Sequence, residues 1–161
     1  MKVSVQIRVS PGVISGDRPM RRIADYACRI EAAGFPGIWV GDSLGRGRPT
    51  LDPLATLASL CSVTDRVELG IAVLQVPLRH PVELAHRVQS VQMLSGNRLV
   101  LGVGSGSTRA DFELLGGDYD RRFRTLMSSL DTMRAAWAGV RERTADPARR
   151  VAQPALDHLC C

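Results

Sequence analysis

Two polar residues that could take part in chemistry follow a short apolar run near residue 40. Asp42 and Ser43 come just after Gly37-Ile38-Trp39-Val40, a run typical of a strand buried on both faces of a parallel sheet. Ligands of parallel α/β proteins bind at the carboxyl ends of strands, so a carboxylate there is a candidate pocket residue, while a loop or helix cap is the alternative. We expect Asp42 to line a pocket, with Ser43 as a candidate substrate contact.

A glycine-rich turn follows a later apolar run, Leu99 to Val103. In Gly104-Ser105-Gly106, backbone amides and a small hydroxyl can approach a ring or substrate without obstruction by a Cβ atom. The glycines are spaced G-x-G-x-G from residue 102, so the third comes one residue too early for the dinucleotide fingerprint G-x-G-x-x-G. The turn also follows the fourth expected strand and not the first, which disfavours a Rossmann fold. We expect Gly104, Ser105 and Gly106 to contact a ligand.

The three histidines and four cysteines do not have the spacing of a metal site or of a disulfide framework. His80 precedes Pro81 at the start of a helical pattern, where it either braces the loop or contacts a cofactor or substrate. We keep it as a candidate contact. His158, Cys160 and Cys161 are too few for a closed metal site, which requires four ligands, so no metal is expected.

Four strands alternating with four helices would position these residues. The expected strands are 3–9, 37–40, 66–74 and 99–103, and the expected helices are 19–34, 52–64, 81–95 and 119–137. Connections of this length imply parallel pairing in right-handed βαβ units, as in half of a barrel or in an open doubly wound sheet. We expect this α/β unit to occupy residues 1–139, and residues 140–161 to form a polar, irregular or partly helical tail without a strand.

The composition narrows the classes of protein. Hydrophobic residues make up 45% of the 161, as in one globular domain, and the net charge of +5 rests on arginines spread along the chain. Aromatic residues are only 4%, whereas proteins that bind single-stranded nucleic acid pair basic grooves with aromatic platforms. Neither a signal-peptide pattern nor an apolar run of about 20 residues is found. We therefore expect a cytoplasmic protein that binds neither nucleic acid nor a membrane.

Two segments of the chain resemble the luciferase-like monooxygenase family, which includes flavin monooxygenases and deazaflavin-dependent dehydrogenases and reductases. The first is Gly34-Phe35-Pro36-Gly37-Ile38-Trp39-Val40-Gly41-Asp42, and the second runs from Arg79-His80-Pro81 into Gly104-Ser105-Gly106. The order and spacing match over about residues 1–138. The resemblance implies a TIM barrel whose cofactor, FMN or coenzyme F420, lies across the carboxyl-terminal mouth. It leaves the choice between the two cofactors open.

The resemblance also implies roles for individual residues. Asp42 corresponds to a position that lines the ring pocket, where an Asp followed by His is frequent, and Ser43 replaces that His. Gly70, Ile71 and Ala72 fall where relatives place a backbone bulge, often with a non-proline cis peptide bond, against the back of the ring. These positions are cofactor contacts by resemblance, and no catalytic residue can be assigned.

The length of the chain is short for this fold, because a TIM barrel typically has about 250 residues and eight strands. The resemblance therefore implies a parallel (β/α)4 half of a barrel, without the later strands that carry much of the phosphate anchorage in relatives. We expect a flavin- or deazaflavin-dependent oxidoreductase or monooxygenase acting on a small molecule, either by hydride transfer or with oxygen. As a fragment it would have reduced activity alone, or none.

Half a barrel also suggests a different function. Four strands leave two sheet edges, each with unpaired amides and carbonyls along a ribbon rich in Val, Ile and Leu. Such a chain is expected to associate with itself. The alternative hypothesis is thus a non-catalytic half-barrel that serves as a self-assembly or partner-binding module.

Overall fold

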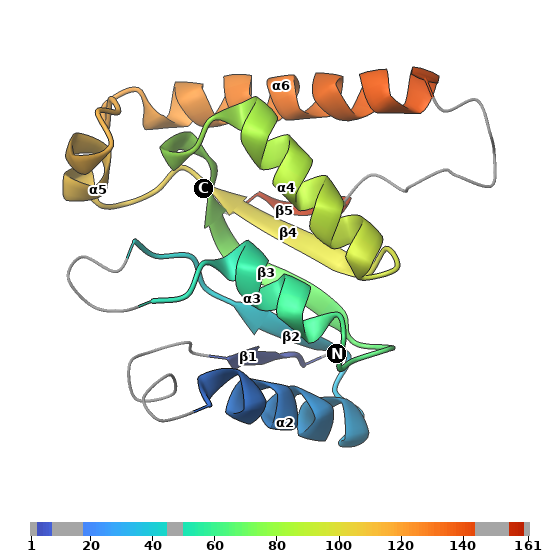
Figure 1. The fold of residues 1–161 in the computed structure, drawn as a ribbon. Coiled ribbons are helices and arrows are strands. Elements are labelled where there is room, and N and C mark those ends of the chain that lie inside the picture. Colours follow the sequence, from blue (N-terminus) through green and yellow to red (C-terminus); the bar gives the residue numbers. More distant parts are fainter. Residues whose placement is uncertain (1–2, 8–17, 45–49, 144–154, 160–161) are drawn as a thin grey trace.

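The computed structural model describes residues 3–7, 18–44, 50–143 and 155–159, which form one parallel sheet with helices (Figure 1). The elements in chain order are β1 (Val5–Ile7), α2 (Pro19–Ala32), β2 (Gly37–Val40), α3 (Pro53–Leu60), β3 (Glu68–Gln75), the 3-10 turn η1 (Val76–Leu78), α4 (Pro81–Leu94), β4 (Leu99–Gly104), α5 (Arg109–Leu114), α6 (Arg122–Arg143) and β5 (Ala155–Leu159). Each strand pairs in parallel with the strand before it. The predicted alternation of strands and helices is confirmed for the first four strands.

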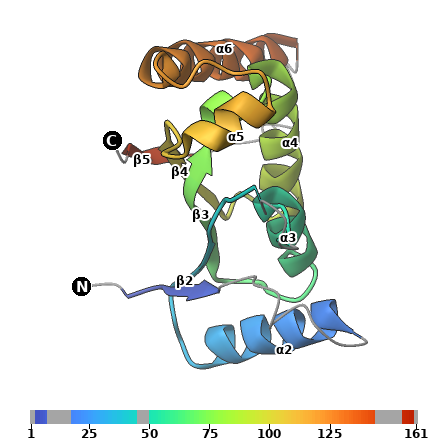
Figure 2. The ribbon, with the colours of Figure 1, turned by 90° about the vertical axis from the view of Figure 1, so that its left-hand side faces the viewer.

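The helices α2, α3 and α4 lie along one face of the sheet, and no helix of the described residues lies on the other (Figure 2). The large apolar side chains of the strands are buried on the helical side. They are Ile38, Val40, Leu69, Ile71, Leu74, Leu99, Leu101 and Val103. Because successive residues alternate between faces, Trp39, Gly70 and Gly102 point to the uncovered side. The apolar side chains of the strands are thus covered by helices, and the uncovered face is rich in glycine.

Two charged side chains fix the amino-terminal ends of the central strands. The carboxylate of Glu31 in α2 accepts hydrogen bonds from the backbone N–H groups of Asp65, Arg66 and Val67, just before β3. Burial by itself raises the pKa of Glu31, but these donors and the Arg66 guanidinium outweigh it, so the pKa lies below its ordinary value. The guanidinium of Arg98 donates to the carbonyl oxygens of residues 64, 67 and 95, which joins the starts of β3 and β4.

The chain after β4 departs from the sequence-based expectation. The short helix α5 was not expected, and α6 extends to Arg143 where the pattern predicted an end near Trp137. Ala155–Leu159 forms a fifth strand that pairs with β4, so the expectation of a tail without a strand was wrong. The segment has only five residues, Ala-Leu-Asp-His-Leu, and its pairing depends on the backbone edge that β4 offers, which the sequence does not display. None of the helices in the described ranges has the length and apolar character needed to cross a membrane.

Candidate functional site

The carboxyl ends of β2, β3 and β4 meet around a pocket of about 420 Å³, which is within the size range of small-molecule sites. Its lining residues are Asp42, Ser43, Ala72, Val73, Gln75, Gly104, Ser105, Gly106, Ser107, Thr108 and Asp111. The structure therefore brings together six of the predicted site residues at one rim. The remaining predicted residues, Gly70, Ile71 and His80, do not line this pocket.

The bulge expected near Gly70 to Ala72 is present in β3. The register between β3 and β4 shifts between Ile71 and Leu74, and the peptide bond joining Ala72 to Val73 is cis. The irregularity turns Ala72 and Val73 toward the pocket. Ile71 is fully buried in the core and takes no part in the lining.

Gly70 lies outside the pocket lining, and packing between strands accounts for its lack of a side chain. It pairs with Trp39 of β2, and the indole of Trp39 lies across it on the uncovered face. A Cβ atom at position 70 would lie 2.3 Å from Cδ2 of that ring, which is far inside van der Waals contact. His80 is likewise placed elsewhere, because it is exposed at the N-cap of α4 and its carbonyl oxygen accepts the first backbone hydrogen bond of that helix.

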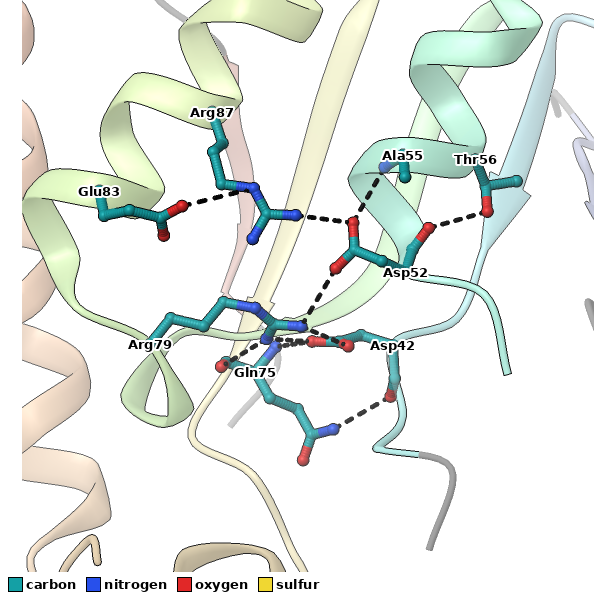
Figure 3. A network of polar contacts seen from close by, with 8 residues as sticks. All are labelled: Asp42, Asp52, Ala55, Thr56, Gln75, Arg79, Glu83 and Arg87. Atoms are coloured by element: carbon teal, nitrogen blue, oxygen red, sulfur yellow. Dashed lines mark hydrogen bonds and ion pairs between the residues drawn. The ribbon is translucent and has the colours of Figure 1, made fainter. Parts of the chain in front are cut away.

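The carboxylate of Asp42 is almost fully buried and is held by the protein itself (Figure 3). Its Oδ2 accepts hydrogen bonds from Arg79 Nη1 at 2.6 Å and from the backbone N–H of Gln75 at 2.8 Å, while Oδ1 accepts from Arg79 Nη2 at 2.8 Å. The side-chain amide of Gln75 donates to the carbonyl oxygen of Asp42 at 3.0 Å. Both carboxylate oxygens are thus engaged, and Asp42 fastens the end of β2 to the end of β3 beside the pocket.

The ion pair extends away from the pocket to the starts of two helices (Figure 3). Asp52 Oδ2 lies 3.8 Å from Arg79 Nη2, and Asp52 Oδ1 accepts from Arg87 Nη2 at 3.0 Å. Asp52 also accepts the backbone N–H of Ala55, which makes it the N-cap predicted for α3. The rim is therefore joined to the amino-terminal ends of α3 and α4 by alternating charges.

The turn after β4 is supported by an aromatic cluster from α5 and the start of α6. Phe112 is buried and meets Tyr119 edge to face, with ring centroids 5.4 Å apart. The guanidinium groups of Arg109 and Arg122 lie 4.5 and 4.0 Å from the centroid of the Tyr119 ring. The hydroxyl of Tyr119 donates to the carbonyl oxygen of Ser107 at 3.2 Å. This packing gives the turn a fixed outer wall.

Gly106 shows how closely the two sides of the pocket approach. Its φ is +80°, a left-handed conformation that favours glycine. A Cβ atom there would lie 3.0 Å from the Phe112 ring and 3.2 Å from Oε1 of Gln75. Glycine is thus needed both for the backbone shape and for the space between the walls. Hydroxyls, an amide and bare backbone line this part of the pocket.

The polar groups that organise the site include several that sequence reasoning missed. Gln75 ends β3 and Arg79 follows η1, and the composition of this segment gives no sign that it meets Asp42, which lies 33 and 37 residues earlier. Asp111 is a buried carboxylate in the lining, and its helix was not expected. Within the described ranges, no group of three or more His, Cys, Asp or Glu side chains could hold a metal ion.

A parallel sheet with helices on one face and a pocket at its carboxyl-terminal rim defines an α/β barrel-type fold. The family model described as Luciferase-like monooxygenase matches residues 1–155. The chain belongs to the luciferase-like monooxygenase family, as the two sequence segments predicted.

Individual relatives show how much of the family's length is present. The chain is 32% identical over 111 residues to 4-hydroxyprotoasukamycin monooxygenase of Streptomyces nodosus subsp. asukaensis, which covers 68% of this chain and 30% of that protein. It is 30% identical over 125 residues to the F420-dependent glucose-6-phosphate dehydrogenase of Amycolatopsis mediterranei (strain U-32), with 73% and 38% covered. The chain thus spans about a third of the length of these curated relatives.

A solved structure confirms the fold. The oxygenating constituent of 3,6-diketocamphane monooxygenase from Pseudomonas putida, a type II Baeyer-Villiger monooxygenase in complex with FMN, superimposes with a TM-score of 0.73 at 16% identity. The match covers 85% of this chain and 39% of that one. The predicted half of a TIM barrel is therefore confirmed as a fold. One of these relatives is named for its dependence on F420, and the solved structure holds FMN.

Proposed function

We propose that this chain supplies the amino-terminal half of the cofactor site of a flavin- or deazaflavin-dependent oxidoreductase or monooxygenase. The proposal rests on one observation. Asp42, the bulge at Ala72 and Val73 in β3, and the turn from Gly104 to Gly106 all line one pocket. The named activities of the relatives, a monooxygenase and an F420-dependent dehydrogenase, support this class of reaction. The substrate would be a small molecule.

The residues of the pocket have distinct tasks in this proposal. Ala72 and Val73 of the bulge would back one face of the ring, and the turn from Gly104 to Gly106 would let its edge approach the backbone. Asp42 holds this wall in place through its two hydrogen bonds with Arg79. The bound cofactor supplies the hydride transfer or the reaction with oxygen, while the protein orients the ring and excludes water.

The chain alone is proposed to have reduced activity or none. A TIM-barrel active site is built from all eight strand-to-helix loops, and the described strands bring only part of that rim. The pocket is therefore walled by β2, β3 and β4, with no helix on the adjacent sheet face in the described ranges. Substrate sequestration and phosphate anchorage would need further barrel segments.

Titration of the purified chain with FMN and, separately, with F420 tests the proposal through the fluorescence of each cofactor. We expect saturable binding of at least one of them, with little turnover. A matched pair of variants places the bound ring in the pocket: Gly106→Ala narrows the gap, whereas Gly116→Ala has the same left-handed backbone with nothing within 4 Å of the added Cβ. Absence of binding to both cofactors up to millimolar concentration would contradict the proposal.

A second candidate function, a self-assembly or partner-binding module, is favoured by the uncovered face of the sheet. Trp39 and Val100 are only half-buried on that face, and β1 and β5 are its outer strands. Another copy of the chain would cover them. Light scattering over a concentration series distinguishes the two: a stable dimer that binds no cofactor supports the module, and a monomer at all concentrations argues against it.

A further inference from the structure

The orientation of the Gln75 side-chain amide is fixed by its neighbours (Figure 3). Nε2 lies 3.0 Å from the carbonyl oxygen of Asp42. A carbonyl oxygen can only accept a hydrogen bond, so the nitrogen of the amide must face it and the oxygen must point the other way. The backbone of Gln75 is held as well, because its N–H donates to Asp42 Oδ2 and its carbonyl oxygen accepts from Arg79 Nη1.

The amide oxygen of Gln75 is directed at the pocket. Gln75 is half-buried and lines the pocket, and Oε1 lies opposite the glycine turn, 3.2 Å from where a Cβ of Gly106 would be. Among the hydrogen bonds of the described residues, none is donated to this oxygen. An acceptor held rigidly at the wall of a partly closed pocket favours a ligand that brings a donor, since leaving it unpaired on binding is costly.

The groups near this acceptor indicate which donor would fit. The hydroxyls of Ser105 and Ser107 and the backbone of the turn lie in the same lining and can donate to carbonyl groups of a ligand. A cyclic imide has an edge with one N–H between two carbonyl oxygens. This edge complements the pocket, where the acceptor Gln75 Oε1 is flanked by these donors. The ring systems of flavins and of deazaflavins both end in such an edge, so this contact would not distinguish the two cofactors.

We propose that Gln75 is a specificity-determining residue whose Oε1 accepts a hydrogen bond from the imide N–H of the ring bound in this pocket. The inference rests on the proposed function only in taking that ring to belong to the cofactor. Asp42 and Arg79 are then positioning residues, because they orient the amide without touching the ring.

The test compares ligands that differ only in the donor. Wild-type chain is titrated with FMN and with N3-methyl-FMN, and the variant Gln75→Met is titrated with both. We expect the wild type to bind FMN about ten-fold more tightly than the methylated analogue, which corresponds to one hydrogen bond, and Gln75→Met to bind the two equally. The control Gln89→Met, the same exchange on α4 away from the pocket, keeps the wild-type preference. Circular dichroism of each variant checks the fold.

Two outcomes overturn the inference: equal binding of FMN and N3-methyl-FMN by the wild type, or an undiminished preference in Gln75→Met. The wild-type comparison does not depend on the folding of any variant. If neither FMN nor F420 binds, succinimide and N-methylsuccinimide are compared on the wild type by NMR at millimolar concentration. A preference for succinimide with shifts of the Gln75 amide supports the imide contact while the proposed cofactor function fails, and equal shifts overturn the imide contact itself.

Discussion

Asp42 and Arg79, 37 residues apart in the chain, form a bidentate ion pair whose side chains are 1% and 13% exposed. A buried ion pair contributes little net stability compared with apolar packing, but removal of one partner leaves the other charge without compensation. The pair lies where β2 ends and β3 turns into η1. It therefore decides the shape of the pocket wall more than the total stability of the fold.

Replacement of Asp42 by Asn should destabilise the chain by about 3–5 kcal/mol, because the Arg79 guanidinium would stay buried without its counter-charge. The free energy of unfolding in urea measures the effect. Asp120→Asn is the matched control, since it removes the carboxylate that pairs with Arg109 on the surface and should change stability little. Equal stabilities of Asp42→Asn and wild type would show that the pair is not structural.

Stability should depend on acid through Glu31. Its pKa is lowered in the folded chain, so the contribution of its carboxylate is complete above the ordinary value of 4.5 and is lost as the pH falls through the folded-state pKa. We expect Glu31→Gln to be less stable than wild type at pH 6 by about 1–2 kcal/mol, and the gap to close as the pH falls below 4.5 and through the folded-state pKa of Glu31. The control Glu113→Gln on exposed α5 should change stability little at pH 6, and a Glu31→Gln gap independent of pH would refute the role of the charge.

Enlargement of Gly106 should weaken ligand binding. A Cβ atom at position 106 would lie 3.0 Å from the Phe112 ring and 3.2 Å from Oε1 of Gln75, so it would narrow the gap and force these side chains to shift. We expect Gly106→Ala to bind the preferred cofactor about ten-fold less tightly, as overpacking of a well-packed site costs roughly 1–3 kcal/mol. Gly116→Ala carries the same backbone penalty in open space, so its affinity should match that of the wild type.

The contact between Trp39 and Gly70 predicts an optical signal. Gly70→Ala would place a Cβ 2.3 Å from the Trp39 indole, so the ring must move, at a cost of about 1–3 kcal/mol. We expect lower stability and a changed tryptophan emission. Gly139→Ala in α6 has open space around the new methyl group and should stabilise the helix by about 0.5–1 kcal/mol. An unchanged emission in Gly70→Ala would contradict the packing.

The elements with strong local patterns could be predicted from the sequence. Asp52 followed by Pro53 predicted the start of α3, and the structure places the Asp52 carboxylate on the backbone N–H of Ala55. The location of Asp42 and Gly104 at one rim was predictable too, because the parallel strands of a sheet bring their carboxyl ends to the same edge.

Contacts that depend on tertiary packing could not be predicted in the same way. Nothing local indicates that Arg79 would reach back to Asp42, or that Gly70 leaves room for a ring from the next strand. Sequence reasoning placed Asp42 in a pocket lining, where the structure has it, but a carboxylate at a strand end gives no indication of its ion-pair partner. The backbone edge of β4 recruits β5 from a segment with no strand pattern of its own.

The order of strands in the sheet, β1-β2-β3-β4-β5, has a consequence for synthesis on the ribosome. Each strand from β2 onward pairs with the strand that was translated just before it. Its partner is therefore already present when it emerges. One helix with its loops separates each of the first four strands from the next, so a strand can pair as soon as that helix has been made. The chain can therefore be assembled one strand and helix at a time as it leaves the exit tunnel, and the pocket walls from β2, β3 and β4 are in place once α5 has emerged.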